Sequence, residues 1–131
     1  MFELKDKVIV LTGATGVLGS ELALSLAKAN AKLVILGRNE VLLDELKKKL
    51  VHLTYVEYHV VNVLDRHELE KVRTSIIQTL GQIDSLINAV GGNLSGAVIP
   101  DDKNIFDLSE TDFDEVVEMN LKGTILPSIV F

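Results

Sequence analysis

Three glycines at a three-residue spacing, Gly13, Gly16 and Gly19, constrain the fold of this chain more than any other sequence feature. The segment before them, Lys7 to Leu11, is apolar, β-branched and continuous, which is typical of a strand buried on both faces of a parallel sheet. The segment after them carries apolar residues at three- and four-residue spacing, which predicts an amphipathic helix. The expected stripe consists of Leu18, Leu22, Leu26 and Ala29. Strand, glycine turn and helix in this order predict the start of a βαβ unit.

The alternation of strand and helix continues along the chain. The apolar run from Lys32 to Leu36 predicts a second strand, and the segments Thr54 to Val61 and Ile83 to Ala89 predict a third and a fourth. Four strands at βα spacing require right-handed crossovers, and therefore predict an α/β fold with a doubly wound parallel sheet. A length of 131 residues is enough for one compact domain. We therefore treat residues 1–131 as part of a single domain.

Helix signals separate these strands. The pattern from Glu40 to Leu50 predicts one helix, and Asp65 with Glu68 three residues later predicts the capped start of another, which ends at Gly81. The apolar face expected for the first of these helices is Val41, Leu42, Leu46 and Leu50. After an irregular loop from Gly91 to about Leu108, Ser109 caps a last helix that is rich in acids in its first turns.

Composition excludes several classes of partner. The formal net charge of -6 repels phosphate backbones, which disfavours nucleic-acid binding. The chain has no cysteine, so it has no disulfide or thiolate metal site, and a reducing cytoplasm is the expected location. No segment approaches the roughly 20 apolar residues of a membrane span. The three histidines are scattered, so we expect no metal site; they are His52, His59 and His67.

The glycine turn predicts a dinucleotide site. In such turns the glycines allow an unusual φ, a close approach of the backbone to a pyrophosphate, and close packing of helix on strand. The free N–H groups near Gly16 and Gly19 would face the phosphates. A tight βα turn without a ligand is the alternative interpretation, but the flanking strand and helix favour a dinucleotide. A phosphate-loop nucleoside triphosphatase is disfavoured because no Gly-Lys-Ser or Gly-Lys-Thr follows the first glycine.

The end of the second expected strand bears on the choice of cofactor. An acid at this position would accept hydrogen bonds from a ribose 2′-hydroxyl, but the sequence places Arg38 and Asn39 after Gly37. A guanidinium can bind a 2′-phosphate with two hydrogen bonds, so Arg38 favours NADP(H), while NAD(H) stays an alternative. A solvated arginine at a strand end is the other interpretation of Arg38.

Five motifs resemble those of the short-chain dehydrogenase/reductase family, in order and over essentially the whole chain. They are Thr12 to Gly19, Asn62 to Asp65, Asp84 to Ile87, Asn88 to Gly91 and Asn120 to Gly123. The resemblance implies a Rossmann-type fold and an oxidoreductase that transfers a hydride between a nicotinamide cofactor and a small-molecule carbonyl or alcohol. It also implies a homo-oligomer for the full-length enzyme.

The resemblance assigns roles to individual residues. Asn62, where the family usually has Asp, would accept from the adenine amino group, and Thr12 would tie the first strand to the fourth. Asn120 would take part in the proton relay beside a catalytic lysine. The residues implied to contact the cofactor are Gly13, Thr15, Gly16, Val17, Leu18, Gly19, Arg38, Asn39, Asn62, Val63, Asn88, Ala89, Val90 and Gly91.

The family's proton donor, a Tyr-x-x-x-Lys pair, does not occur in these 131 residues, because Tyr55 and Tyr58 are followed by His59 and Asn62. With the apolar end at Phe131, this predicts the cofactor-binding half of an enzyme, truncated after the fourth strand and following helix and inactive alone. A non-catalytic dinucleotide sensor is one alternative. The glycine spacing resembles the extended epimerase branch, which is another.

Two further segments narrow the resemblance. Gly91 to Asn93 and Gly123 to Ser128 resemble the fructuronate reductase or D-mannonate oxidoreductase subgroup. Enzymes of this subgroup reduce the ketone of a sugar acid. The resemblance therefore implies a sugar acid as the substrate.

Overall fold

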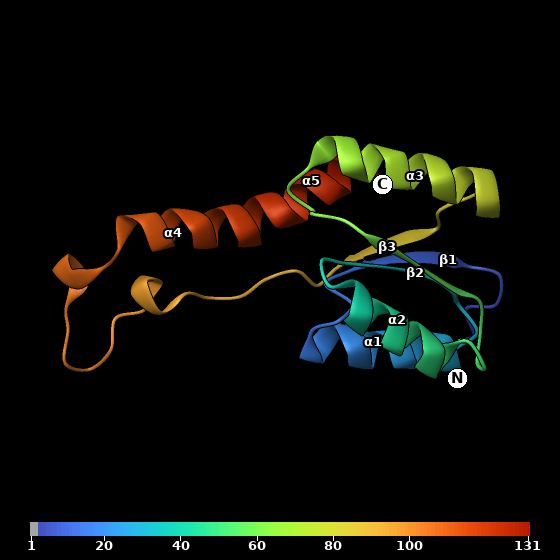
Figure 1. Cartoon of the computed structure of the whole chain (residues 1–131), viewed down its shortest axis with the longest axis horizontal. Helices are drawn as coiled ribbons and strands as arrows, with labels where there is room; N and C mark the ends of the chain where they lie inside the picture. The colour runs from blue at the N-terminus through green and yellow to red at the C-terminus, as the bar shows by residue number, and fades with distance from the viewer. Residues whose placement is uncertain (1–2) are drawn as a thin grey trace.

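Four parallel strands form the central layer of the computed structural model, which describes residues 3–131 (Figure 1). The strands are β1 (Val8–Thr12), β2 (Lys32–Gly37), β3 (Val56–Val60) and β4 (Ser85–Asn88). Their order in the sheet is β3-β2-β1-β4, and every pair is parallel. The chain runs outward from β1 through β2 to β3 and then crosses back to place β4 on the other side of β1. This reversal confirms the expected doubly wound topology.

Helices cover both faces of the sheet. The helices α1 (Val17–Lys28) and α2 (Glu40–Leu50) lie on one face, and α3 (Arg66–Leu80) and α5 (Gly123–Val130) lie on the other (Figure 1). An apolar core lies on each face of the sheet, and strand β1 contributes to both. Ile9 and Leu11 pack with α1 and α2, while Val8 and Val10 pack with α3. The continuous apolar run of β1 is thus buried on both faces, as expected for a central parallel strand.

The buried face of α1 differs from the expected leucine stripe. Leu18 is 68% exposed, and the residues that are buried against the sheet are Gly19, Ala23 and Ala27. These small residues let the helix axis approach the sheet closely, and the leucines at 22 and 26 pack beside them, partly buried. The stripe expected from periodicity was therefore displaced by one residue.

The buried face of α2 also differs by one position. Leu46 and Leu50 are buried as expected, but Val41 and Leu42 are 66% and 44% exposed. Leu43 takes their place with no exposed surface, and it packs beneath Gly37. Leu43 lies three and seven residues before Leu46 and Leu50, so it shares their helix face.

The predicted helix ends agree with the structure. The Asp65 side chain accepts a hydrogen bond from the Glu68 N–H at 3.0 Å, and α3 ends at Gly81, whose φ is 79°. Ser109 likewise accepts from the Asp112 N–H at 3.2 Å. The strands begin and end within a few residues of the predicted bounds.

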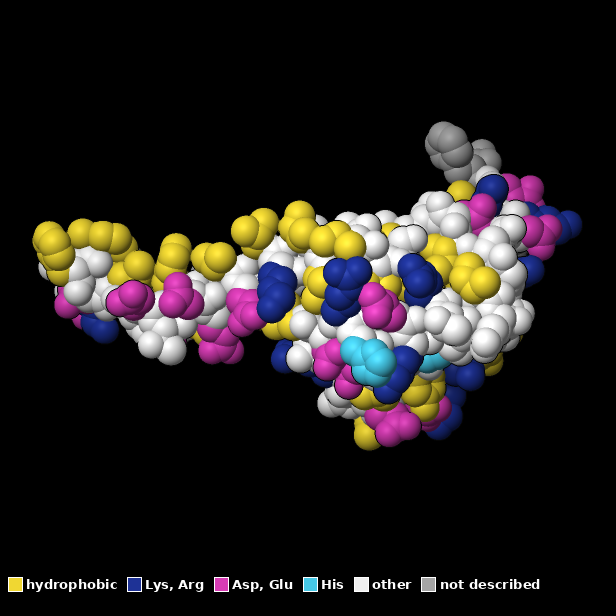
Figure 2. Space-filling model, turned by 90° about the horizontal axis from the view of Figure 1, so that it is seen from above, with side chains coloured by type: hydrophobic (Ala, Val, Ile, Leu, Met, Phe, Trp, Pro, Cys, Tyr) yellow, Lys and Arg dark blue, Asp and Glu magenta, His cyan; other side chains and the backbone are white. Residues whose placement is uncertain are grey.

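An arm extends from the body after β4 (Figure 1). It contains two 3-10 turns, η1 (Ser95–Ala97) and η2 (Ile105–Asp107), then α4 (Glu110–Val117) and the π-helical turn η3 (Glu118–Lys122), which leads back to α5 on the body. Apolar side chains follow one side of the arm (Figure 2). Phe113, Val117 and Leu121 are exposed at four-residue spacing, and Ile125 and Ile129 of α5 continue this spacing. Among residues 3–131, no helix is long and apolar enough to cross a membrane.

Candidate functional site

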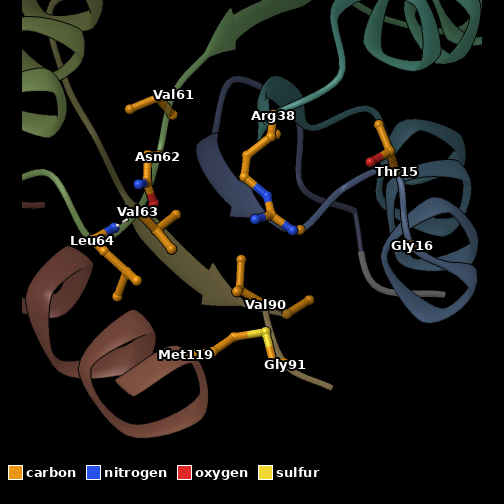
Figure 3. Close-up of a pocket in the computed structure, with 13 residues that line it drawn as sticks. Thr15, Gly16, Arg38, Val61, Asn62, Val63, Leu64, Val90, Gly91 and Met119 are labelled. Carbon is orange, nitrogen blue, oxygen red and sulfur yellow. Dashed lines mark hydrogen bonds between the residues drawn. The ribbon is translucent and has the colours of Figure 1, made fainter. Parts of the chain in front are cut away.

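A cleft lies at the carboxyl ends of the four strands, next to the point where the strand order changes direction (Figure 3). Ligands of doubly wound sheets bind at this place. Its wall comes from the glycine turn, from the segments that follow β2, β3 and β4, and from η3. The lining residues are Gly13, Thr15, Gly16, Gly37, Arg38, Val61, Asn62, Val63, Leu64, Ala89, Val90, Gly91 and Met119.

The three glycines of the turn occupy different environments. Gly13 has a φ of 63°, and a Cβ there would lie 2.5 Å from the Ala89 carbonyl oxygen. A Cβ on Gly19 would overlap the Gly13 carbonyl oxygen, so α1 packs there against bare backbone. A Cβ on Gly16, which lines the cleft, would meet only the Gly13 oxygen, at 3.4 Å, and would otherwise lie in open space. Two glycines thus shape the turn, and the third leaves space for a ligand.

The N-terminus of α1 begins at this turn. Gly16 is the N-cap residue and has no side chain to cap the helix, and the first helical hydrogen bond runs from the Ser20 N–H to the Gly16 oxygen at 2.9 Å. The N–H groups before Ser20 have no partner within the helix, and the helix dipole is positive at this end. Val17 and Leu18 do not line the cleft with their side chains, which are 90% and 68% exposed. Their backbone N–H groups are the part suited to an anion.

Arg38 is the only charged residue that lines the cleft in the described part of the chain. It follows the end of β2, and Figure 3 shows its side chain extending into the cleft between Asn62 and the turn at Gly16. Asn39, by contrast, does not line the cleft. Its side-chain oxygen accepts from the Leu42 N–H at 3.1 Å and caps α2.

The segment after β3 forms an apolar wall. Val61 and Val63 are 2% and 7% exposed. Between them, the Asn62 side-chain oxygen accepts from the Leu64 N–H at 3.1 Å, and the Asn62 N–H donates to the Glu68 carboxylate at 3.0 Å. An amide oxygen has two lone pairs, so Asn62 keeps one acceptor site for a ligand.

The end of β4 is held to its neighbours on both sides. The buried Thr12 hydroxyl accepts from the Ala89 N–H at 3.2 Å, which confirms the predicted link between the first and fourth strands. Asn88 does not line the cleft, because its amide nitrogen donates to the Ser128 hydroxyl of α5 at 3.0 Å. Successive strand residues face opposite sides, so Asn88 and Ala89 have different surroundings. The Asn88 side-chain oxygen is buried without a partner among residues 3–131.

Two neighbouring residues of η3 contact the loop after β4. The Asn120 side-chain oxygen accepts from the Gly92 N–H at 3.1 Å, and its nitrogen donates to the Gly92 and Val116 oxygens, both at 2.8 Å. Asn120 therefore holds Gly92 and does not line the cleft. Met119 does line it, and Figure 3 shows its side chain directed toward Val90 and Gly91.

Four lining residues were missed by the sequence prediction: Gly37, Val61, Leu64 and Met119. Each of them directly precedes or follows a residue that a motif had singled out, namely Arg38, Asn62, Val63 or Asn120. Proximity to the motifs was thus the available signal.

The titratable groups with altered pKa values lie outside the cleft. The hydrogen bond from the Tyr55 hydroxyl to Glu57, at 2.7 Å, raises the pKa of Tyr55 to about 12. The Val8 N–H and then the Lys7 ammonium, both bonded to Asp84, lower the pKa of that carboxyl. Neither group is placed to act on a ligand in the cleft, because neither belongs to its wall.

Comparison with known proteins gives related sequences and structures. The family described as short chain dehydrogenase matches residues 7–130. An uncharacterized oxidoreductase from Staphylococcus saprophyticus is 33% identical over 99% of this chain and 56% of its own length. A candidate D-mannonate oxidoreductase from Haemophilus influenza, solved with NAD bound, is 31% identical with a TM-score of 0.89, over 98% of this chain and 50% of its own. A metagenomic short-chain oxidoreductase in complex with NADP is 22% identical with a TM-score of 0.83, over 98% of this chain and 56% of its own. The chain thus spans about half the length of these relatives.

Proposed function

Because this chain belongs to the short-chain dehydrogenase family, we propose that its cleft binds a nicotinamide dinucleotide for hydride transfer. The observation that carries the proposal is the cleft itself. The uncapped N-terminus of α1, Gly16 and Arg38 meet there, at the point where the strand order of the sheet changes direction. The NAD in the Haemophilus structure and the NADP in the metagenomic one support this class of ligand.

The residues of this cleft fit the parts of such a ligand. Backbone N–H groups in the first turn of α1, after Gly16, would bind the pyrophosphate, because they lie at the positive end of the helix dipole and have no partner within the helix. The apolar wall at Val61 and Val63 would accept the adenine, and Asn62 would accept from its amino group. The segment from Ala89 to Gly91 would lie along the nicotinamide side. When bound, the nicotinamide would supply or accept the hydride.

We further propose a preference for NADP(H). A 2′-phosphate on the adenosine ribose carries negative charge, and Arg38 is the charged side chain that reaches into the cleft. No acid among the described lining residues would repel that phosphate. A guanidinium–phosphate contact with two charge-assisted hydrogen bonds stabilises a complex by about 1.5–3 kcal/mol, or roughly 10- to 150-fold in affinity.

Titration of the chain with NADPH and with NADH tests this preference. We expect NADPH to bind at least about tenfold more tightly. Arg38→Asp should abolish this difference or reverse it, because a carboxylate repels the 2′-phosphate and accepts from the 2′-hydroxyl. Lys49→Asp is the matched control: it makes the same change in net charge on an exposed residue at the other end of α2. Equal affinities in the wild-type chain, or an unchanged ratio in Arg38→Asp, would refute the preference.

The remaining features of the function are part of the same proposal. The substrate is a small-molecule carbonyl or alcohol, and a sugar acid is supported by the name of the Haemophilus relative at 31% identity. The full enzyme acts as a homo-oligomer in the cytoplasm, and residues 1–131 bind the dinucleotide without turnover. Asn120 is proposed as a positioning residue of the relay region, since its side chain holds Gly92.

A further inference from the structure

Met119 carries the only sulfur atom in residues 3–131. The sequence has no cysteine, and its other methionine, Met1, lies outside the described residues. Met119 is partly buried in η3, where it forms part of the cleft wall (Figure 3). A chemical change at this single sulfur atom would therefore alter the wall of the proposed dinucleotide site.

The contacts of Met119 connect it to the loop that closes one end of the cleft. Its methyl carbon lies 3.4 Å, and its sulfur 3.9 Å, from the position that a Cβ on Gly92 would occupy. The next residue, Asn120, forms two hydrogen bonds with the backbone of the same Gly92. Met119 thus lies next to Gly92, and the adjacent Asn120 bonds to it, so a displaced Met119 side chain would disturb the adjoining Gly91 segment of the wall.

Oxidation by a peroxide changes the polarity of this side chain. The sulfur lone pair attacks one oxygen of hydrogen peroxide, so that an S–O bond forms and the O–O bond breaks. The other oxygen leaves as hydroxide and takes up the proton of the transferred oxygen, which gives water. The sulfur is oxidised and the peroxide is reduced. The resulting sulfoxide oxygen is a hydrogen-bond acceptor, and the neighbouring wall side chains of Leu64 and Val90 have no donor to offer it.

We propose that Met119 is an oxidation-sensitive modification site, and that its conversion to the sulfoxide by a peroxide weakens dinucleotide binding. This inference rests on the proposed function, because it needs a dinucleotide in the cleft. The coupling between binding and oxidation is reciprocal. If oxidation of Met119 lowers the affinity for the dinucleotide by some factor, then bound dinucleotide shifts the equilibrium between thioether and sulfoxide toward the thioether by the same factor. Methionine sulfoxide reductases, supplied with a dithiol that is oxidised to a disulfide, remove the oxygen as water and restore the thioether and, with it, the affinity.

The test measures the affinity of the chain for NADPH and NADH before and after treatment with hydrogen peroxide. Peptide mass spectrometry identifies which methionine has gained an oxygen atom. We expect at least about a tenfold loss of affinity when Met119 is oxidised, and recovery after incubation with methionine sulfoxide reductases.

Met119→Leu is the matched variant, because it approximately conserves the side-chain volume and removes the sulfur, while the sequence keeps Met1. The ratio of its affinities before and after treatment should stay near one. Met119→Gln should give a weak binder that peroxide does not weaken further, since its amide places a polar group in the same wall.

Each outcome bears on the inference. An oxidised Met119 with unchanged affinity, a Met119 that resists peroxide while Met1 reacts, or an equal loss in Met119→Leu would each overturn it and leave the proposed function intact. If the untreated chain binds neither NADPH nor NADH, both the proposed function and the inference fail.

Discussion

Replacing Gly19 by alanine should destabilise the fold, although the same change inside most helices is favourable. Alanine is preferred over glycine by about 1 kcal/mol within a helix. Here, however, the added Cβ would overlap the Gly13 carbonyl oxygen, and would lie 2.9 Å from the Gly13 carbonyl carbon and 3.0 Å from the Ala14 Cα. All three atoms belong to the backbone, so no side chain can rotate away and α1 itself must move.

The size of the effect follows from these two opposing contributions. Forcing atoms into a packed region costs about 1–3 kcal/mol and occasionally more, and a rigid backbone neighbour places Gly19 at the upper end. Subtracting the helix preference of about 1 kcal/mol leaves a loss of about 2 kcal/mol in the free energy of unfolding. With a urea dependence of about 2 kcal/mol per molar, the midpoint should fall by about 1 M. Dinucleotide affinity should fall as well, because the N-terminus of α1 is displaced.

Gly16→Ala is the matched control for this prediction. Its Cβ would meet only one atom, at 3.4 Å, so we expect a change in unfolding free energy below about 1 kcal/mol. Because Gly16 lines the cleft, the same Cβ should lower dinucleotide affinity. Urea denaturation followed by circular dichroism, together with dinucleotide titration, separates the two variants. A Gly19→Ala chain as stable as the wild type would refute the packing argument.

Two further variants test other parts of the structure. Thr12→Val keeps the shape of the buried side chain but leaves the partly buried Ala89 N–H without its acceptor, so urea denaturation should show a loss of about 1 kcal/mol, and an unchanged midpoint would contradict the role of the hydroxyl. The lowered pKa of Asp84 means that its ionised form stabilises the fold above the ordinary pKa of 3.8, and that this contribution is lost as the pH falls below that value. Asp84→Asn should therefore reduce the dependence of stability on pH between about pH 5 and pH 2, and equal slopes for the two chains would refute this assignment.

The strands and most helix ends could be predicted because their signals are local. A continuous β-branched run indicates β1, and a capping side chain lies within a few residues of the helix that it caps, as at Asp65 and Ser109. The buried face of α1 could not be predicted in this way, because two adjacent stripes satisfy the same periodicity. Close contact with the sheet selected the small residues Ala23 and Ala27 over the leucines.

In the candidate site, too, the features with local sequence signals could be predicted, and those that depend on the tertiary fold could not. Gly13, Gly16 and Arg38 line the cleft, since their places depend on the backbone turn and on a strand end, whereas Gly19 packs against the backbone of Gly13 and Ala14. Asn39 and Asn88, which are also expected to contact the cofactor, do not line the cleft, and their side chains bond to α2 and to Ser128. The second of these partners is 40 residues distant in sequence, so it follows from the tertiary fold alone. The contact made by the π-helical turn also depends on the tertiary fold, because Asn120 bonds to Gly92, which is 28 residues distant in sequence.

The strand order also determines how late the cleft can form during folding. Ile9 of β1 pairs with Leu33 of β2, 24 residues away, but with Ser85 of β4, 76 residues away. Closing the longer loop costs about 1 kcal/mol more in chain entropy, by the logarithmic dependence of closure entropy on loop length. We therefore expect β1, β2 and β3 to associate first, and β4 to complete the sheet. The part of the cleft wall from Ala89 to Gly91 then forms only after β4 has joined the sheet. A ligand that contacts both this segment and the glycine turn would therefore stabilise the association of β4 with the other three strands.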